Sequence, residues 1–589
     1  MHLTPIDWLI IAAYFVLSLA IGLYYYRRAG ESTEEYFVAG RNLPWWLAGT
    51  SMVATTFAAD TPLAVTEMVA RNGVAGNWLW WSMLPSGMLT VFFFARLWRR
   101  AEVLTDVEFV ELRYSGRPAA FLRGFRALYL GFVLNLIIMG WVNLGMAKVL
   151  GGTLGLQKWQ ALAFCLGITF LYSILSGIWG VVVTDAVQFV IAMLGSIALA
   201  FVALQAVGGV EGLKTGLAAV APAGSSQPFG NEALSIWPDG SMPWMLPLLT
   251  LVTYLGVNWW ASWYPGAEPG GGGYVAQRIF SAKDERHGVL ATLWFNVAHY
   301  ALRPWPWIIV ALCSVVLYKG APVNPATGQV DAAFGYVLVM NDYLPAGWRG
   351  LLLASFAAAY MSTISTQMNW GSSYIVNDFY RRFVRAEATE RHYVLVSRIA
   401  TFVTVILSVI VTYYMNRITG GWELVLTLGA GTGLVYILRW YWWRINAWSE
   451  IAAMSAALIV SLTLTWAGVF EAGTPLGFAQ TILTTVAVTT AAWLAATFAT
   501  APEPRSVLQS FYNRVRPAGP GWQAFAGSGG AVTAPPEPLA PNFLNWILGV
   551  VVVYSTLFAI GDLLFGYLLR GLGLAALAVV GGVVLGRRL

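Results

Sequence analysis

Long apolar runs follow one another along almost the whole chain, separated by short polar segments. A bilayer core of about 30 Å requires roughly 20 apolar residues in a helix, and by this measure the sequence contains about fifteen candidate spans. They occupy residues 8–26, 45–69, 76–98, 127–146, 159–175, 179–207, 244–264, 289–317, 350–375, 399–414, 424–438, 451–466, 478–498, 543–560 and 572–585. The first run lacks a basic n-region and a small-residue cleavage site, which favours a retained helix over a signal peptide. The pattern predicts an all-α polytopic membrane protein.

The composition excludes several other classes of protein. Hydrophobic residues make up 58% of the 589 positions and charged residues only 11%, against about 25% in a typical soluble domain. Because so few charges cannot cover a soluble surface of this size, a soluble enzyme, a disordered chain and a nucleic-acid binder are excluded despite the formal charge of +6. Cys165 and Cys313 lie inside apolar runs, which argues against a disulfide or a cysteine metal site.

Basic residues follow the first, third, seventh and ninth runs and are sparse in the loops between them. This alternation predicts a plasma-membrane protein with the N-terminus outside and the C-terminus in the cytoplasm. Loops 208–243 and 319–349 then lie outside, and the Pro-rich stretch 500–541 forms a cytoplasmic linker. The basic residues assigned to the cytoplasmic side are Arg27, Arg28, Arg41, Arg99, Arg100, Arg113, Arg117, Arg123, Arg126, Arg278, Lys283, Arg286, Arg381, Arg382, Arg385 and Arg391.

Two of the predicted spans contain helix breakers. Residues 49–62 of the second span are small and polar and include Asp60 and Pro62, while residues 264–274 of the seventh contain two prolines and five glycines. Unsatisfied backbone groups in lipid cost several kcal/mol each, so broken segments must face protein or a cavity. Interruptions at matching positions of two oppositely oriented halves are typical of a transporter's midplane binding site. The alternative is a packing kink in one helix and a re-entrant loop in the other.

A face of small and hydroxylated residues runs along the ninth span. Ala359, Ser362, Thr363 and Thr366 recur at i, i+3, i+4 and i+7, which places them on one helical face. Hydroxyl oxygens beside carbonyl groups freed at a helix break form a site for a hard cation. The alternative is that these hydroxyl groups bond their own i−4 carbonyl oxygens or aid helix packing.

Six short segments resemble the sodium:solute symporter family, which includes sodium-coupled sugar, proline, sialic acid and iodide carriers. In chain order they are YFVAGRNLPWW at 36–46, SGIW at 176–179, VTDAVQ at 183–188, QR at 277–278, MST at 361–363 and DFY at 378–380. The resemblance implies a five-plus-five inverted repeat of helices, the LeuT-type transporter core, preceded by one helix and followed by a variable number.

With that fold, the chain divides into two five-helix repeats flanked by further helices. The expected units are an N-terminal helix and cytoplasmic loop at 1–44, the first repeat at 45–208, an extracellular loop at 209–243, the second repeat at 244–446, two further helices at 447–499, the Pro-rich linker at 500–541 and two C-terminal helices at 542–589.

The resemblance also implies where the coupling ion, sodium, binds. The main site lies between the second and ninth spans and is formed by three carbonyl and two hydroxyl oxygens, from Ala54, Phe57, Ala359, Ser362 and Thr363. In family members with a second sodium ion, an aspartate on the sixth span joins further hydroxyl groups, and the matching residues here are Asp185, Ser362, Ser365 and Thr366. The alternative for Asp185 is a hydrogen-bonded waypoint for one exiting sodium ion, so one ion or two are expected.

Residues near the two breaks form the expected substrate site, which consists of Asp60, Thr61, Ser82, Glu268, Tyr274 and Arg303. Asp60, Thr61 and Ser82 resemble substrate-contact positions of the family, and Tyr274 resembles its aromatic inner gate. Glu268 lies in the second break.

Arg303 lies in mid-span, near the position where sugar carriers of the family have a lysine. An internal ion pair with Asp60 or Glu268 is an equal alternative to substrate contact for this arginine. His299, one turn earlier, is expected to be a core histidine rather than a proton relay.

These observations together predict sodium-coupled symport of a small polar organic solute, such as a sugar, sugar acid or amino acid, by alternating access. The expected partners are the solute, sodium and the lipid bilayer, with no nucleic acid, and the protein is expected to function as a monomer. The rivals are a proton-coupled permease that uses Asp185 or His299, and a solute sensor that does not transport. An integral membrane enzyme is disfavoured because the four histidines form no metal-spaced cluster or nucleophile-base motif.

Overall fold

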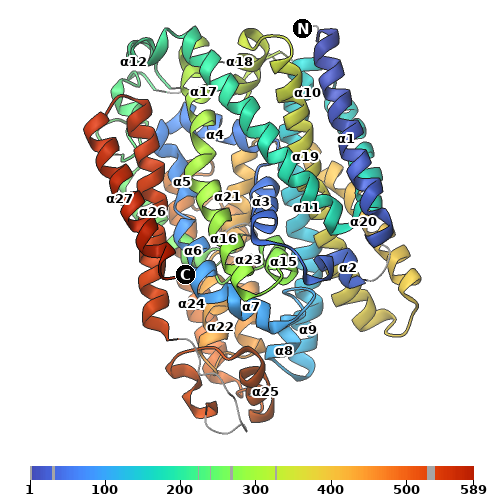
Figure 1. Ribbon diagram of the computed structural model, residues 1–589. Coiled ribbons are helices and arrows are strands. Elements are labelled where there is room, and N and C mark those ends of the chain that lie inside the picture. The colour runs from blue at the N-terminus through green and yellow to red at the C-terminus, as the bar shows by residue number, and fades with distance from the viewer. Residues whose placement is uncertain are drawn as a thin grey trace.

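The chain forms an upright bundle of helices, seen here in a computed structural model (Figure 1). The structure describes residues 3–29, 33–222, 225–238, 240–264, 269–320, 322–325, 328–526 and 538–589. α12 (Gly209–Ala218) and α18 (Gly335–Tyr343) lie at the same end of the bundle as the N-terminus, while α8 (Phe109–Arg113) and α25 (Arg505–Val515) lie at the opposite end. Strands β1 (Val323–Asn324) and β2 (Gln329–Val330) form one antiparallel pair in a loop.

The remaining elements follow in chain order. The other helices before residue 220 are α1 (Pro5–Ala29), α2 (Thr33–Val38), α3 (Trp45–Thr56), α4 (Thr61–Asn72), α5 (Trp78–Trp81), α6 (Leu84–Leu89), α7 (Ala95–Ala101), α9 (Gly116–Leu128), α10 (Asn135–Leu154) and α11 (Lys158–Ala206). Those after residue 240 are α13 (Leu248–Thr253), α14 (Trp259–Ala261), α15 (Gly273–Ser281), α16 (Glu285–Val297), α17 (Pro304–Leu317), α19 (Trp348–Ser373), α20 (Glu390–Tyr414), α21 (Ile418–Leu428), α22 (Gly433–Tyr441), α23 (Ala447–Trp466), α24 (Pro475–Ala499), α26 (Leu539–Leu564) and α27 (Leu568–Gly586). Short 3₁₀ segments are η1 (Ala39–Arg41), η2 (Val74–Asn77), η5 (Asn231–Leu234), η8 (Ala332–Phe334) and η10 (Pro520–Phe525), and π-helical segments are η3 (Thr90–Phe94), η4 (Tyr129–Leu134), η6 (Tyr254–Asn258), η7 (Ala298–Leu302) and η9 (Tyr374–Val384).

The helices confirm a multi-pass membrane protein. Within the described residues, ten helices are long and apolar enough to span a bilayer, or eleven if α21 and α22, bent by 45°, count as one span. The broken helices do not reach that length, and hydroxyl and amide side chains lower the hydropathy of α19. α11 is 49 residues long, about twice what one crossing needs, and it contains the predicted span 159–175 and all but the last residue of the predicted span 179–207. The number of fifteen spans stays a prediction.

Both predicted helix breaks are present. α3 ends at Thr56, and Phe57 leaves the helical region with φ −95° and ψ 76°. Pro62 stands in the first turn of α4, where its missing N–H costs no hydrogen bond. In the second break, Gly270 and Gly271 have φ of +86° and +76°, a left-handed conformation that favours glycine. Residues 265–268 of this break lie outside the described residues.

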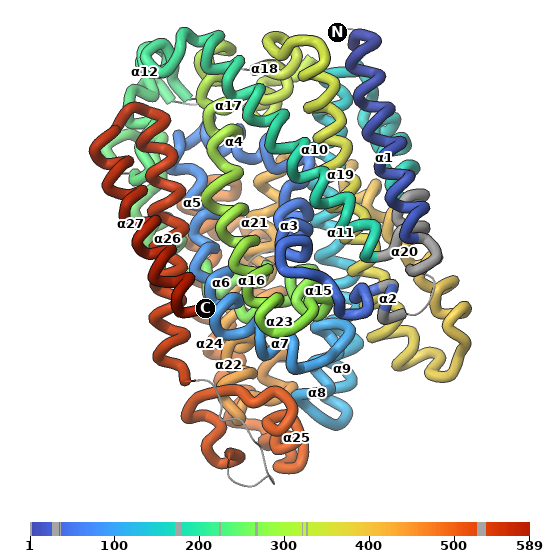
Figure 2. Tube along the Cα trace, in the orientation of Figure 1, coloured from blue at the N-terminus to red at the C-terminus, as the bar shows by residue number. Residues whose placement is uncertain are grey.

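The first broken helix lies inside the bundle. Figure 2 shows α11 crossing the bundle obliquely, and α11 packs against α1, α3, α17 and α19. α3 also packs against α16 and α19. Such enclosure by neighbouring helices is the condition under which interrupted backbone is tolerated at membrane depth.

The expected linker 500–541 contains structure that the sequence analysis did not predict. α25 and η10 bury aromatic and aliphatic side chains against the end of the bundle opposite the N-terminus. The guanidinium carbon of Arg113 lies 5.3 Å from the ring centre of Phe511 and 5.1 Å from that of Trp522. The indole of Trp522 donates to the carbonyl oxygen of Trp440 at 2.7 Å. Residues 527–537 of this stretch lie outside the described residues.

Two arginines that the sequence analysis assigned to a cytoplasmic loop are fully buried. Arg113 donates to four carbonyl oxygens at and beyond the end of α22. Arg126 pairs with Glu450 at 2.9 Å, and Arg439 pairs with the same carboxylate at 3.2 Å. These arginines therefore hold the end of the bundle together, and a count of loop charges overstates the basic surface there.

Candidate functional site

The broken end of α3 is bonded directly to α19. The hydroxyl of Thr363 donates to the carbonyl oxygen of Thr55 at 2.8 Å. The last four carbonyl groups of a helix lack intrahelical partners, and Thr55 is one of these. α19 thus satisfies a backbone group that the break leaves free.

The five residues expected to hold sodium surround this bond. Ala54 precedes Thr55 on α3 and Phe57 is the first residue after that helix; Ser362 precedes Thr363 on α19, and Ala359 lies one turn earlier. Each has at most 4% of its surface exposed.

The oxygens of this group are suited to a hard cation. Ser362 donates its proton to Oδ1 of Asp185 at 2.5 Å, and Thr363 donates to Thr55. A hydroxyl has one proton and two lone pairs, so both oxygens keep lone pairs for a cation. Within the described residues no hydrogen bond reaches the carbonyl oxygen of Phe57. Neutral hydroxyl and carbonyl oxygens are ligands that a hard cation accepts.

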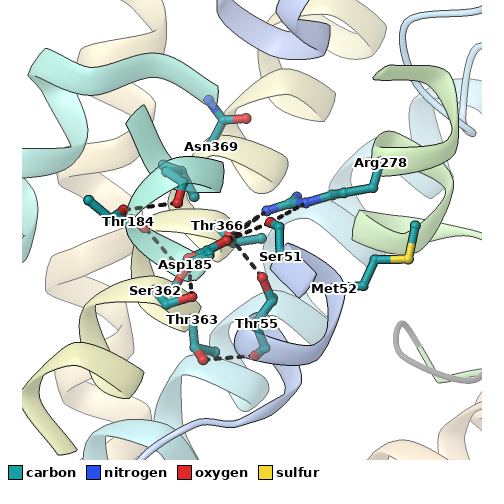
Figure 3. A network of polar contacts seen from close by, with 12 residues as sticks. Ser51, Met52, Thr55, Thr184, Asp185, Arg278, Ser362, Thr363, Thr366 and Asn369 are labelled. Atoms are coloured by element: carbon teal, nitrogen blue, oxygen red, sulfur yellow. Dashed lines mark hydrogen bonds and ion pairs between the residues drawn. The ribbon is translucent and has the colours of Figure 1, made fainter. Parts of the chain in front are cut away.

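Asp185 lies beside these residues, at the junction of three helices (Figure 3). Oδ2 accepts a hydrogen bond of 2.5 Å from Ser51 on α3, and Oδ1 accepts the bond from Ser362 on α19. Arg278 of α15 lies 4.0 Å from Oδ2 and donates to the hydroxyl of Thr366 at 2.9 Å. The structure thus brings Asp185, Ser362 and Thr366 together as the sequence analysis expected.

Two details of this group differ from the sequence analysis. Ser365 donates to the carbonyl oxygen of Ser362 at 3.1 Å, and no contact with Asp185 is recorded for it in the described part of the chain. Arg278, which the analysis assigned to a cytoplasmic loop, is 1% exposed and points into the bundle. The short helix α15 follows the glycine-rich break and turns Arg278 back towards α3.

A cavity of about 70 Å³ lies next to the residues expected to bind sodium, and Thr363 is part of its wall. Of the expected substrate residues, Asp60, Thr61, Tyr274 and Arg303 line it. Ser82 is buried but does not line the cavity; its hydroxyl lies 3.5 Å from the carbonyl oxygen of Leu79. Glu268 lies outside the described residues. The remaining lining residues are Thr55, Thr56, Ala58, Leu79, Trp80, Met83, Ile138, Trp141, Val142, Tyr264, His299, Tyr300, Thr363, Gln367, Trp422 and Leu426.

Three residues that line this cavity each have one buried polar atom without a hydrogen-bond partner among the described residues. These atoms are Oδ1 of Asp60, Nε of Arg303 and Oε1 of Gln367. The other carboxylate oxygen of Asp60 accepts a bond of 3.3 Å from the indole of Trp422. Because buried polar atoms are normally paired, two acceptors and one donor of the wall are available to a polar ligand.

Arg303 and His299 contact the broken helix rather than a described carboxylate. Arg303 forms no ion pair within 4 Å among the described residues; its Nη1 donates to the carbonyl oxygen of Val53 at 3.2 Å and to Thr56 at 3.1 Å. The ring of His299 lies 3.1 Å from the same hydroxyl and packs 5.5 Å from the ring of Trp80.

The sequence analysis did not name several residues that line the cavity, and only some of them could have been found from the sequence. Thr56 and Gln367 lie inside the broken segment and the hydroxylated face, where any polar side chain is a candidate. Trp422 lies on α21, two residues before the predicted span 424–438, and no sequence pattern links it to Asp60.

The chain matches the model of the sodium:solute symporter family over residues 36–459. It is 26% identical to the sodium/mannose cotransporter SLC5A10 of Bos taurus, covering 78% of this chain and 79% of that protein. It is 23% identical to a sodium/glucose cotransporter of Vibrio parahaemolyticus, covering 78% of this chain and 85% of the relative. These relatives are transporters by name.

The fold is similar to that of a Na⁺-coupled sialic acid symporter solved in a substrate-bound outward-open state. The TM-score is 0.66 and the identity 19%, with 85% of this chain and 99% of the other covered. This similarity confirms the predicted LeuT-type five-plus-five core. Since the family model spans most of the chain and the fold agrees, the chain belongs to the sodium:solute symporter family.

Proposed function

We propose that this sodium-coupled symporter carries a small polar organic solute, such as a sugar, sugar acid or amino acid, across the plasma membrane. The repeats are 45–208 and 244–446, the N-terminus lies outside, the C-terminus lies in the cytoplasm, and the monomer in the bilayer is the working unit. Sodium binds to the carbonyl oxygens of Ala54, Phe57 and Ala359 and to the hydroxyl oxygens of Ser362 and Thr363.

A wall shared between the sodium ligands and the solute cavity supports this proposal most strongly. Thr363 is a proposed sodium ligand and also lines the cavity. Thr55, whose carbonyl oxygen accepts the hydrogen bond from Thr363, lines the cavity as well. A sodium ion that fixes α3 against α19 therefore also fixes the cavity wall. Because coupling of two binding sites is reciprocal, the solute must raise the affinity for sodium by the same factor.

Alternating access follows from the same contact. Sodium binds more tightly to the conformation in which the end of α3 and α19 lie together, and it shifts the population towards that conformation. When sodium leaves on the side of low concentration, the carbonyl groups at the end of α3 lose that ligand. α3 and α19 can then separate and open the cavity inwards.

The chemistry of the cavity favours a solute with several hydroxyl or N–H donors. Oδ1 of Asp60 and Oε1 of Gln367 accept such donors, and Nε of Arg303 donates to an oxygen of the solute. Trp80, Trp141 and other aromatic side chains supply faces on which a ring can stack. The named solutes of the relatives, mannose and glucose, satisfy these requirements.

Uptake into proteoliposomes tests this proposal. Purified protein is reconstituted and supplied with radiolabelled monosaccharides, polyols, sugar acids and amino acids under an inward sodium gradient or an equal potassium gradient. We expect one class to accumulate only with sodium. Accumulation driven by a proton gradient without sodium would favour the proton-coupled rival, and binding without accumulation would favour the sensor.

A further inference from the structure

Asp185 is a buried carboxylate whose hydrogen bonds come from neutral groups. Ser51 and Ser362 each donate one hydroxyl proton at 2.5 Å, one to each carboxylate oxygen, and the side chain of Asp185 is 1% exposed. Hydroxyl dipoles do not neutralise a charge, and an isolated buried carboxylate is costly. The charge of Asp185 therefore has to be balanced, either by a cation beside it or by protonation.

Arg278 supplies a cation at this place. Its Nη2 lies 4.0 Å from Oδ2 of Asp185, and its own side chain is also 1% exposed. Its Nε lies 3.3 Å from the hydroxyl of Ser51, which in turn donates to Oδ2. The guanidinium is thus connected to the carboxylate both by charge and through one hydroxyl (Figure 3).

Neighbouring side chains hold the guanidinium in position. Nη1 donates to Oε1 of Gln277 at 2.8 Å, and Nε2 of Gln277 donates to Oδ1 of Asn369 at 3.1 Å and to the carbonyl oxygen of Phe37 at 3.0 Å. The C-terminal end of α15 is held as well, because the N–H of Leu43 donates to the carbonyl oxygen of Ser281 at 2.9 Å. Arg278 is therefore a fixed part of this network rather than a mobile surface charge.

The hydroxyl groups that a second sodium ion would use already form hydrogen bonds in this network, but a hydroxyl that donates keeps its lone pairs, so the decisive factor is charge. The Thr366 hydroxyl accepts from Arg278, the Ser362 hydroxyl donates to Asp185, and the Ser365 hydroxyl donates within α19. A sodium ion added here would bring a second positive charge to one carboxylate, within a few ångströms of the guanidinium. These residues do not fit a second sodium ion while Arg278 is in place.

We propose that Arg278 supplies the positive charge opposite Asp185 in place of a second sodium ion, so that each transport cycle carries one sodium ion. The proposal rests on the proposed sodium-coupled function. It implies that Arg278 and a sodium ion cannot both lie beside Asp185. The main site adjoins this network through Ser362, which is a proposed sodium ligand and donates to Asp185. Its other ligands Ala54, Phe57 and Thr363 make no contact with Arg278 in the described residues.

Counting bound sodium ions tests the proposal without requiring the solute. Purified full-length protein is equilibrated with ²²Na⁺ at saturating concentration, and ions per protein are measured. We expect one ion for the native protein, one for Arg278→Lys, which keeps the charge, and two for Arg278→Gln, which frees Asp185. The double variant Asp185→Asn/Arg278→Gln removes both charges and should return to one ion. Arg100→Gln, which breaks the Arg100–Glu285 pair elsewhere, is the matched control and should also bind one.

Sodium-dependent thermal stability gives a second readout on the same variants. The Hill coefficient of the melting-temperature shift should be one for the native protein and should rise to two for Arg278→Gln. Two ions on the native protein, or one on a folded Arg278→Gln, would overturn this inference while leaving sodium coupling intact. No sodium on the native protein would instead overturn the proposed function. If Arg278→Gln does not fold, the number of sodium ions bound by the native protein and by the double variant still tests the proposal.

Discussion

Arg303 donates a hydrogen bond of 3.2 Å to the carbonyl oxygen of Val53, near the C-terminal end of α3. Its guanidinium carbon also lies 5.3 Å from the ring centre of Trp307, on the next turn. A cation at the C-terminal end of a helix is stabilised by the helix dipole. Because Arg303 also lines the cavity, it links the solute site to the helix whose end forms the proposed sodium site.

Replacing Arg303 should uncouple solute binding from sodium binding. In Arg303→Gln, we expect solute affinity to fall and the gain in solute affinity on adding sodium to shrink towards a factor of one, since a coupling free energy requires a physical connection. Solute binding is measured with and without sodium. The exposed Arg398→Gln on α20 is the control. An unchanged sodium effect in Arg303→Gln would show that coupling runs elsewhere.

Asp60→Asn tests the carboxylate of the cavity. A hydrogen bond to a charged group contributes about 1.5–3 kcal/mol, so solute affinity should fall by about 10- to 150-fold. The amide keeps the shape and can still accept from Trp422, which limits damage to the fold. Equilibrium binding of the solute identified in the uptake panel measures this loss. Glu211→Gln, whose side chain is 86% exposed, should bind normally; full affinity in Asp60→Asn would remove this carboxylate from the solute site.

Glu450→Gln should destabilise the end of the bundle without touching either ligand site. Glu450 pairs with Arg126 and Arg439 and accepts from the hydroxyl of Tyr114 at 2.7 Å. Removing one member of a buried ionic group costs about 3–5 kcal/mol because it leaves the other charges uncompensated. Thermal unfolding of purified protein should show a clear loss for Glu450→Gln and almost none for the exposed Glu390→Gln. Equal melting temperatures would mean that this group contributes little to stability.

The sequence predicted the membrane class, the two breaks and four residues of the cavity wall for identifiable physical reasons. Pro62 cannot continue a helix, and the glycines after Pro269 permit left-handed backbone. Hydroxyl groups at helical spacing on α19 placed Ser362 and Thr363 on one face. Each of these patterns involves residues close together in the sequence, so it can be recognised without knowing how distant segments pack.

The residues that the sequence could not place depend on how distant segments meet. Arg278 follows an apolar run and looks like a loop charge, yet the chain turns at the second break and buries it beside Asp185. Trp422 contacts Asp60 from a helix more than 350 positions away. α25 folds because the end of the bundle offers Arg113 and Trp440 as partners, which no pattern within 505–525 reveals.

Sodium binding to the double variant Ser362→Ala/Thr363→Ala tests the central claim most directly. A ligand that binds only the folded state stabilises it by about 2.7 kcal/mol at a concentration of 100 Kd, so sodium should raise the melting temperature of the native protein above its value in equal potassium. The variant lacks two of the five proposed ligands and should lose nearly all of that sodium-specific shift. A native protein that responds to sodium together with a folded variant that responds equally would contradict the account.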